Sequence, residues 1–135
     1  MKEKILFVNS CVRGENESRT LALAKTALSR LDGDIEEIRL ADANLKPLDA
    51  AGLAKRAESA EKNDFSDPVY DCAKQFAACD TVVVAAPFWD YSFPAFLKIY
   101  IESLCVGGLT FLYGSEKTDL YHHFGRIYRR NGLRL

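Results

Sequence analysis

The sequence lacks the features that would assign it directly to a membrane, a zinc site or a nucleoside triphosphate. No apolar run approaches the roughly 20 residues that a membrane-spanning helix needs, and nothing at the N-terminus resembles a secretory signal. The four cysteines follow no zinc-ligand spacing, and the chain has neither the Gly-Lys-Ser/Thr of a P-loop nor a Gly-x-Gly-x-x-Gly motif. We therefore expect a cytoplasmic protein without a metal, a disulfide or a membrane partner.

An excess of charge of one sign is also absent. The chain has 18 Lys and Arg residues against 19 Asp and Glu residues, which gives a formal net charge of −1 and no reason to expect nucleic acid as a partner. The 135 residues, 48% hydrophobic and 27% charged, suit one packed domain. Only the tail departs from this balance. It is expected to be solvated, and its basic residues are Arg126, Arg129, Arg130 and Arg134.

Apolar patterning predicts strands that alternate with helices. Strands are expected over residues 4–8, 35–40 and 81–86. Helices are expected over residues 18–31, 68–78 and 94–104, with a short exposed helix within 53–61. The last strand is apolar on both faces, which is typical of a central strand covered by helices. This alternation predicts an α/β fold with a parallel sheet.

The loop after the first strand, residues 9–20, has the chemistry of a phosphate site. It combines the hydroxyls of Ser10, Ser18 and Thr20 with the flexible Gly14. It also leads into a helix N-terminus, whose free amides and dipole favour an anion. One phosphate monoester fits this loop better than a triphosphate or a dinucleotide.

Other interpretations of this loop remain open. Ser18 is equally well explained as a helix cap, and the carboxylates of Glu15 and Glu17 count slightly against an anion. Cys11 is the one cysteine that lies in this loop and so the one considered for reactivity. Cys72 and Cys79 share a helix face and are expected to pack in the core.

A second loop, after the last predicted strand, is rich in aromatic residues. It reads Pro87-Phe88-Trp89-Asp90-Tyr91-Ser92-Phe93-Pro94-Ala95. Aromatic side chains on a strand-to-helix turn are costly to expose, so we expect them to cover something apolar and flat. The alternative is that they pack against the protein's own core or a subunit interface.

Together the two loops resemble those of the flavodoxin-like family of FMN-dependent NADH-azoreductases and NAD(P)H:quinone dehydrogenases. The resemblance implies a three-layer sandwich with a parallel sheet in the order 2-1-3. It places the FMN phosphate on residues matching Ser10, Ser18, Arg19 and Thr20. It places the isoalloxazine ring along Pro87, Phe88, Trp89, Asp90 and Tyr91, and it puts the segment 108–111 near the flavin or the dimer edge.

In that family, NADH or NADPH passes a hydride to the flavin, which reduces a small flat acceptor such as a quinone or an azo compound. The resemblance therefore implies an FMN-dependent oxidoreductase, a homodimer, and no side chain that acts as a nucleophile or an acid. A carboxylate beside the ring would disfavour an anionic reduced flavin. We therefore expect Asp90 to serve through its backbone amide.

The resemblance covers residues 3–113. We predict a flavodoxin-like domain over 1–113 and a divergent tail over 114–135, with a helix near 119–130 and surface histidines at His122 and His123. The family's later strands are expected to be missing, which would leave the third strand without a neighbour. Two other functions stay open: a non-catalytic module without FMN, and a binding module for another phosphorylated ligand.

Overall fold

The computed structural model describes residues 2–111, and the predicted tail helix and His122 and His123 lie outside them. A parallel sheet stands at the centre, with its strands in the order β2-β1-β3. Its strands are β1 (Glu3–Asn9), β2 (Gly33–Arg39) and β3 (Thr81–Ala85). The predicted order 2-1-3 is confirmed.

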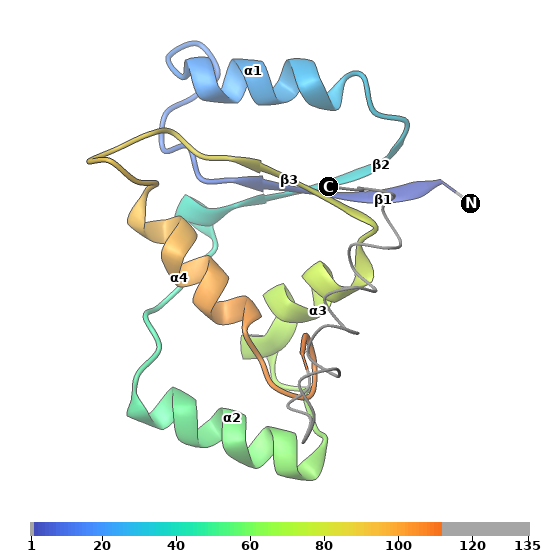
Figure 1. Ribbon diagram of the computed structural model, residues 1–135, viewed down its shortest axis with the longest axis vertical. Helices are drawn as coiled ribbons and strands as arrows, with labels where there is room; N and C mark the ends of the chain where they lie inside the picture. The colour runs from blue at the N-terminus through green and yellow to red at the C-terminus, as the bar shows by residue number, and fades with distance from the viewer. Residues whose placement is uncertain (1, 112–135) are drawn as a thin grey trace.

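Helices cover both faces of the sheet, as Figure 1 shows. One face carries α1 (Arg19–Leu28), and the other carries α3 (Asp71–Ala78) and α4 (Ala95–Leu104). A further helix, α2 (Ala50–Lys62), lies beyond α3 and α4, away from the sheet. None of the helices within residues 2–111 is long and apolar enough to cross a membrane.

The central strand β1 explains the core. Alternate side chains of a strand point to opposite faces, and both faces of β1 are buried. Ile5 and Phe7 pack with Leu21 and Leu28 of α1, whereas Leu6 and Val8 pack on the other face with Leu40, Leu97 and Tyr100. Burying one such side chain stabilises the fold by about 1.5–3 kcal/mol.

The strand β3 corrects one expectation. It was predicted to be a central strand covered on both faces, but Val84 is 47% exposed. Within residues 2–111, β3 pairs only with β1, so it forms an edge of the described sheet, as expected from the sequence for a third strand without a further neighbour. The strand is therefore more apolar than its partial burial among residues 2–111 would require.

Helix boundaries also differ from the predictions. Helix α1 ends at Leu28 rather than at residue 31, because β2 begins at Gly33 and the intervening residues cross from the helix to the sheet. As a result Leu31, the last residue of the predicted helix, is exposed. The predicted helix over 68–78 is a 3-10 turn over Pro68–Tyr70 followed by α3, with the Asp67 carboxylate accepting from the Val69 amide at 2.9 Å.

Helix α2 is longer than the segment 53–61 that was predicted. Asp49 caps it by accepting a hydrogen bond from the Gly52 amide at 2.8 Å. The helix ends at Asn63, whose φ of 49° is the left-handed conformation that asparagine tolerates.

Candidate functional site

The two loops singled out from the sequence meet at the carboxyl edge of the sheet. They follow the adjacent parallel strands β1 and β3 (Figure 1). The Ser10 amide and the Ser10 hydroxyl both donate to the Ala85 carbonyl oxygen, at 3.0 and 2.6 Å. Ligands of open α/β sheets bind outside this edge. The chain thus brings the phosphate-type loop and the aromatic loop to one place.

The first loop ends in a capped helix with free donors. The Ser18 hydroxyl accepts from the Leu21 amide at 3.1 Å, so the predicted cap is confirmed. Because a hydroxyl is also a donor, Ser18 keeps a hydrogen to offer a ligand. Among residues 2–111, the amides of Arg19 and Thr20 have no protein acceptor. These are the orphan donors of a helix N-terminus.

The charges around this loop are more favourable to an anion than the sequence suggested. No acidic residue occupies the first turn of α1. The Glu15 carboxylate forms an ion pair with Lys25, which lies towards the other end of α1. One of the two carboxylates that counted against an anion is therefore neutralised by this partner.

The start of the loop is buried. Ser10 is 1% exposed, and its hydroxyl hydrogen is used by Ala85. Cys11 is also buried and packs with the α1-side core, so its thiol is shielded from solvent. The side chains of Ser18 and Thr20 are partly accessible, and that of Arg19 is exposed.

Sequence reasoning missed Asn9, the last residue of β1. Its side-chain oxygen accepts from the Cys11 amide at 3.0 Å, and its amide nitrogen donates to the Glu37 carboxylate at 2.9 Å. The first of these bonds is an Asx turn, a local bond that asparagine commonly makes. The sign in the sequence was an asparagine placed directly after an apolar strand.

The second loop is a tight turn that displays aromatic rings. Trp89 and Ser92 exchange two backbone hydrogen bonds of 2.8 Å, and Asp90 and Tyr91 between them have φ values of 48° and 62°. Positive φ at both central residues defines a type I′ turn, which favours Asn and Gly. A bulky residue such as Tyr91 is strained there.

The rings in this turn do not pack into the protein's own core. Phe88 is 76% exposed and Tyr91 is 95% exposed, while their rings contact each other edge-on at 6.3 Å. The alternative that these aromatic residues pack against the core is therefore wrong for these two side chains. Exposed apolar surface of this kind marks a site for a ligand or a partner.

The segment 108–111 lies at the other end of α4 from the aromatic turn (Figure 1). The Gly108 amide donates to the Phe111 carbonyl oxygen at 2.8 Å, and Gly108 has a φ of 85°. Leu109 packs against a small core that contains Tyr70 and Val106. In the described residues this segment is structural, and it is not brought to the two loops.

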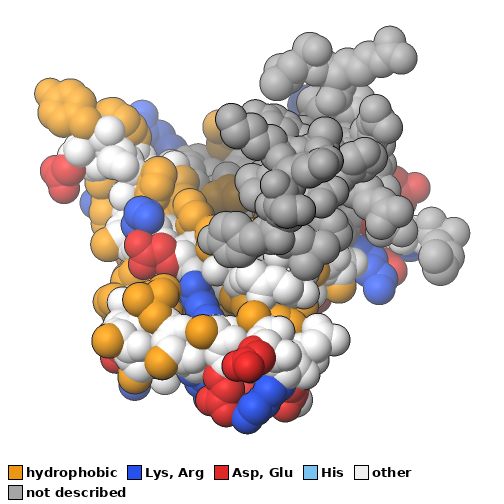
Figure 2. All heavy atoms as spheres, turned by 60° about the horizontal axis from the view of Figure 1, so that its bottom comes forward, with side chains coloured by type: hydrophobic (Ala, Val, Ile, Leu, Met, Phe, Trp, Pro, Cys, Tyr) orange, Lys and Arg blue, Asp and Glu red, His pale blue; other side chains and the backbone are white. Residues whose placement is uncertain are grey.

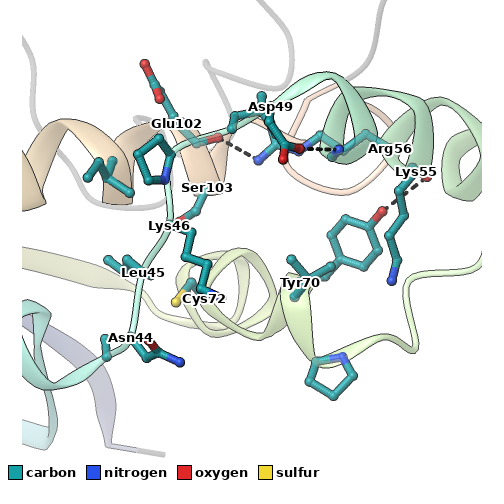
Figure 3. Close-up of a pocket in the computed structure, with 17 residues that line it drawn as sticks. Asn44, Leu45, Lys46, Asp49, Lys55, Arg56, Tyr70, Cys72, Glu102 and Ser103 are labelled. Carbon is teal, nitrogen blue, oxygen red and sulfur yellow. Dashed lines mark hydrogen bonds between the residues drawn. The ribbon is translucent and has the colours of Figure 1, made fainter.

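A pocket of about 370 Å³ lies between α2, α3 and α4, away from the two loops (Figure 3). Its polar groups largely hold α2 in place. The Arg56 guanidinium donates to the carbonyl oxygens of Glu102 and Cys105 at the end of α4, at 2.9 and 3.0 Å. The Tyr70 hydroxyl donates to Ser59 at 2.8 Å.

The exposed side of α2 carries apolar residues in its first half and charged residues, among them Glu58, Glu61 and Lys62, in its second half. Figure 2 shows hydrophobic side chains gathered at this end of the molecule, and Leu53 on α2 is exposed. In the pocket beneath α2, the side chains of Arg56, Tyr70 and Asp49 already form hydrogen bonds that hold or cap α2, so these groups are not free for a ligand. We therefore place the candidate site at the two loops.

Three ionisable groups lie between the sheet and α3 and α4. Burial raises the pKa of the Cys72 thiol and of the Cys79 thiol, and it raises the pKa of the Tyr100 hydroxyl strongly. The Tyr100 hydroxyl is buried without a hydrogen-bond partner among the described residues. These groups are neutral at physiological pH, and the two cysteines pack against the core as predicted.

Comparisons with known proteins agree with the fold. A family described as having a flavodoxin-like fold matches residues 3–127. An FMN-dependent NADH:quinone oxidoreductase of Clostridium perfringens (strain ATCC 13124) is 31% identical over an alignment of 118 residues, and the match covers 84% of this chain and 60% of that protein. An FMN-dependent NADH:quinone oxidoreductase 2 of Clostridium acetobutylicum (strain ATCC 824) is 36% identical over 128 residues, covering 84% of this chain and 58% of that protein.

A crystal structure of an azoreductase from Bacillus anthracis (strain Sterne) matches with a TM-score of 0.65 and 24% identity. The match covers 84% of this chain and 60% of that chain, and at this identity it supports the fold alone. The chain thus spans no more than 60% of the length of these three proteins.

Proposed function

This chain belongs to the family with the flavodoxin-like fold, and we propose that its two carboxyl-edge loops bind FMN in an NADH- or NADPH-dependent oxidoreductase. The observation that carries the proposal is the pairing of Ser10 with Ala85. It sets a helix N-terminus suited to a phosphate beside exposed aromatic rings suited to a flat ring system. The relatives named FMN-dependent NADH:quinone oxidoreductases support it.

The residues of the first loop fit a phosphate monoester. The free amides of Arg19 and Thr20, the donor hydrogen of Ser18 and the hydroxyl of Thr20 are suited to phosphate oxygens. The exposed Arg19 adds positive charge. Ser10 supports the loop and is not assigned as a phosphate donor, because its hydroxyl hydrogen is donated to the Ala85 carbonyl oxygen.

The residues of the second loop fit the apolar ring. Phe88 and Tyr91 offer exposed ring surface, and Trp89 is partly exposed beside them. Pro87 and Asp90 would contact the ring through backbone groups. The Asp90 amide has no acceptor within residues 2–111. An amide at the ring edge would donate to a flavin heteroatom without bringing the Asp90 carboxylate close to it.

Bound FMN would supply hydride transfer from NADH or NADPH to a small-molecule acceptor of the quinone or azo class. The protein's part is to hold the phosphate, to orient the ring and to leave one ring face accessible. No side chain is assigned as a nucleophile or as an acid.

We also infer a homodimer from the exposed apolar surface. Leu53 of α2 and Phe96 and Ile101 of α4 are large apolar side chains that this part of the chain leaves exposed. Light scattering coupled to size exclusion would give twice the 15.1 kDa mass of the chain if the inference holds. A monomer at micromolar concentration would contradict it.

The proposed function is tested by loading the purified chain with FMN, removing free flavin and adding NADH or NADPH without oxygen. We expect the flavin absorbance to bleach and to return when a quinone is added. Protein that retains no FMN would support the non-catalytic module. Protein that holds another phosphate compound instead would support the third interpretation.

A further inference from the structure

Asn9 links the end of β1 to the first loop of the candidate site and to the neighbouring strand β2. It is 2% exposed, and it lies on the face of the sheet that α1 covers, beneath the first loop. Its side-chain oxygen accepts from the Cys11 amide, and its nitrogen donates to Glu37 on the neighbouring strand β2. Both ends of a buried amide are thus used, which fixes the orientation of the side chain.

This arrangement decides how the chain leaves the sheet. The Asx turn at Asn9 takes up the Cys11 amide, while Ser10 is tied to β3 through Ala85. Exposure begins at Val12, so the accessible part of the loop starts from an anchored point. The second loop is shaped separately, by the bonds between Trp89 and Ser92.

We propose that Asn9 is a positioning residue for the phosphate group. By holding the backbone of residue 11, it sets where residues 12–20 and the N-terminal amides of α1 lie relative to the aromatic turn. This inference rests on the proposed FMN site. It goes beyond that proposal because it assigns to Asn9, which is not among the proposed ligand contacts, an effect on the binding of the phosphate and not of the ring.

Selectivity between two flavins provides the test. FMN and riboflavin share the ring, and only FMN carries the phosphate. In Asn9→Ala we expect the dissociation constant of FMN to rise about tenfold, because the loosened loop would have to be ordered when the phosphate binds. The dissociation constant of riboflavin should change less than about twofold. Quenching of flavin fluorescence measures both, and circular dichroism checks that the variant is folded.

Variants of the exposed Glu37 keep the test decisive if Asn9→Ala does not fold. Glu37→Gln removes the charge but keeps an oxygen for the Asn9 amide, whereas Glu37→Ala removes both. We expect Glu37→Ala to bind FMN more weakly than Glu37→Gln, with equal riboflavin binding. Glu36→Gln is the matched control, because the Glu36 carboxylate instead accepts from Gln75 at 2.6 Å.

The outcomes separate the two claims. Wild-type protein that binds neither flavin would overturn both the FMN site and the role of Asn9. Wild-type protein that binds FMN, with Asn9→Ala weakening FMN and riboflavin by the same factor, would overturn only the positioning role. The same conclusion follows if Glu37→Ala and Glu37→Gln bind FMN equally.

Discussion

Ser10 and Ala85, 75 positions apart in the sequence, are joined by two hydrogen bonds to one carbonyl oxygen. This link joins the residue that follows β1 to the last residue of β3. It therefore ties together the starts of the two loops, one of which leads to the helix N-terminus that we assign to the phosphate and the other to the aromatic turn that we assign to the ring.

The first prediction concerns Ser10. Because the Ser10 amide still donates to Ala85 after mutation, Ser10→Ala should lower the free energy of unfolding by only about 1 kcal/mol. FMN affinity should fall less than about threefold, since the hydroxyl is not assigned to the phosphate. Urea unfolding and a flavin titration measure the two effects. A large loss of FMN affinity with unchanged stability would instead indicate a direct contact.

The second prediction concerns the exposed rings. Phe88→Ala and Tyr91→Ala should each weaken FMN and riboflavin binding equally, by about three- to tenfold, the scale of an aromatic contact. The melting temperature should not fall, because neither ring is buried. Leu23→Ala, an exposed apolar residue on α1, is the control and should leave flavin binding unchanged. A drop in stability without a change in binding would point to packing in place of ligand contact.

The third prediction uses the strain at Tyr91. Glycine adopts the left-handed conformation without the penalty of about 1 kcal/mol or more that a side chain incurs. Tyr91→Gly should therefore raise the melting temperature while it weakens flavin binding. Ser92→Gly, at a residue without positive φ, should lower the melting temperature. If both variants melted at lower temperature, strain in the turn would be refuted.

The fourth prediction concerns the attachment of α2. Arg56→Ala removes the donors to the carbonyl oxygens of Glu102 and Cys105 and should lower stability by about 1 kcal/mol. Hydrogen exchange should become faster in α2 but not in β1. Arg56→Lys keeps the charge but cannot bridge two carbonyls in the same way, so it should restore little. Full rescue by lysine would show that charge alone matters.

The fifth prediction is an order of cysteine reactivity. The raised pKa of Cys72 and of Cys79 lowers their thiolate fraction at neutral pH, and the thiolate is the reactive form. Alkylation in the native state should therefore modify the exposed Cys105 first, and Cys11 should stay protected by burial. Raising the pH should increase the rates at Cys72 and Cys79. Peptide mass spectrometry gives the order, and early modification of Cys11 would contradict it.

Much of the fold could be predicted because its strongest patterns are local. The apolar runs of β1 and β3 and the cap at Ser18 follow from residues a few positions apart. The extent of α2 could not be predicted in this way, because its buried residue, Ser59, is covered by Tyr70 through a distant contact. The exposure of Val84 could not be predicted either, because it depends on the position of β3 at the edge of the described sheet and not on the apolar sequence of the strand.

The candidate site was predicted in part. The two loops and the residues proposed for the site could be named from the sequence. Which of their polar groups are already bound within the protein could not. The Ser10 hydroxyl donates to the Ala85 carbonyl oxygen, and Glu15 forms an ion pair with Lys25. Both are tertiary contacts, which the sequence alone does not predict. Asn9 was missed because its partner Glu37 belongs to another strand.

The central claim is that the two loops form one FMN site, and a titration of FMN into the purified chain tests it most directly. We predict saturable quenching of the flavin fluorescence with one FMN per chain. The quenching should weaken in both Thr20→Val, in the first loop, and Phe88→Ala, in the second. Riboflavin binding should weaken only in Phe88→Ala. Flavin fluorescence that stays unquenched at a large excess of protein would contradict the account.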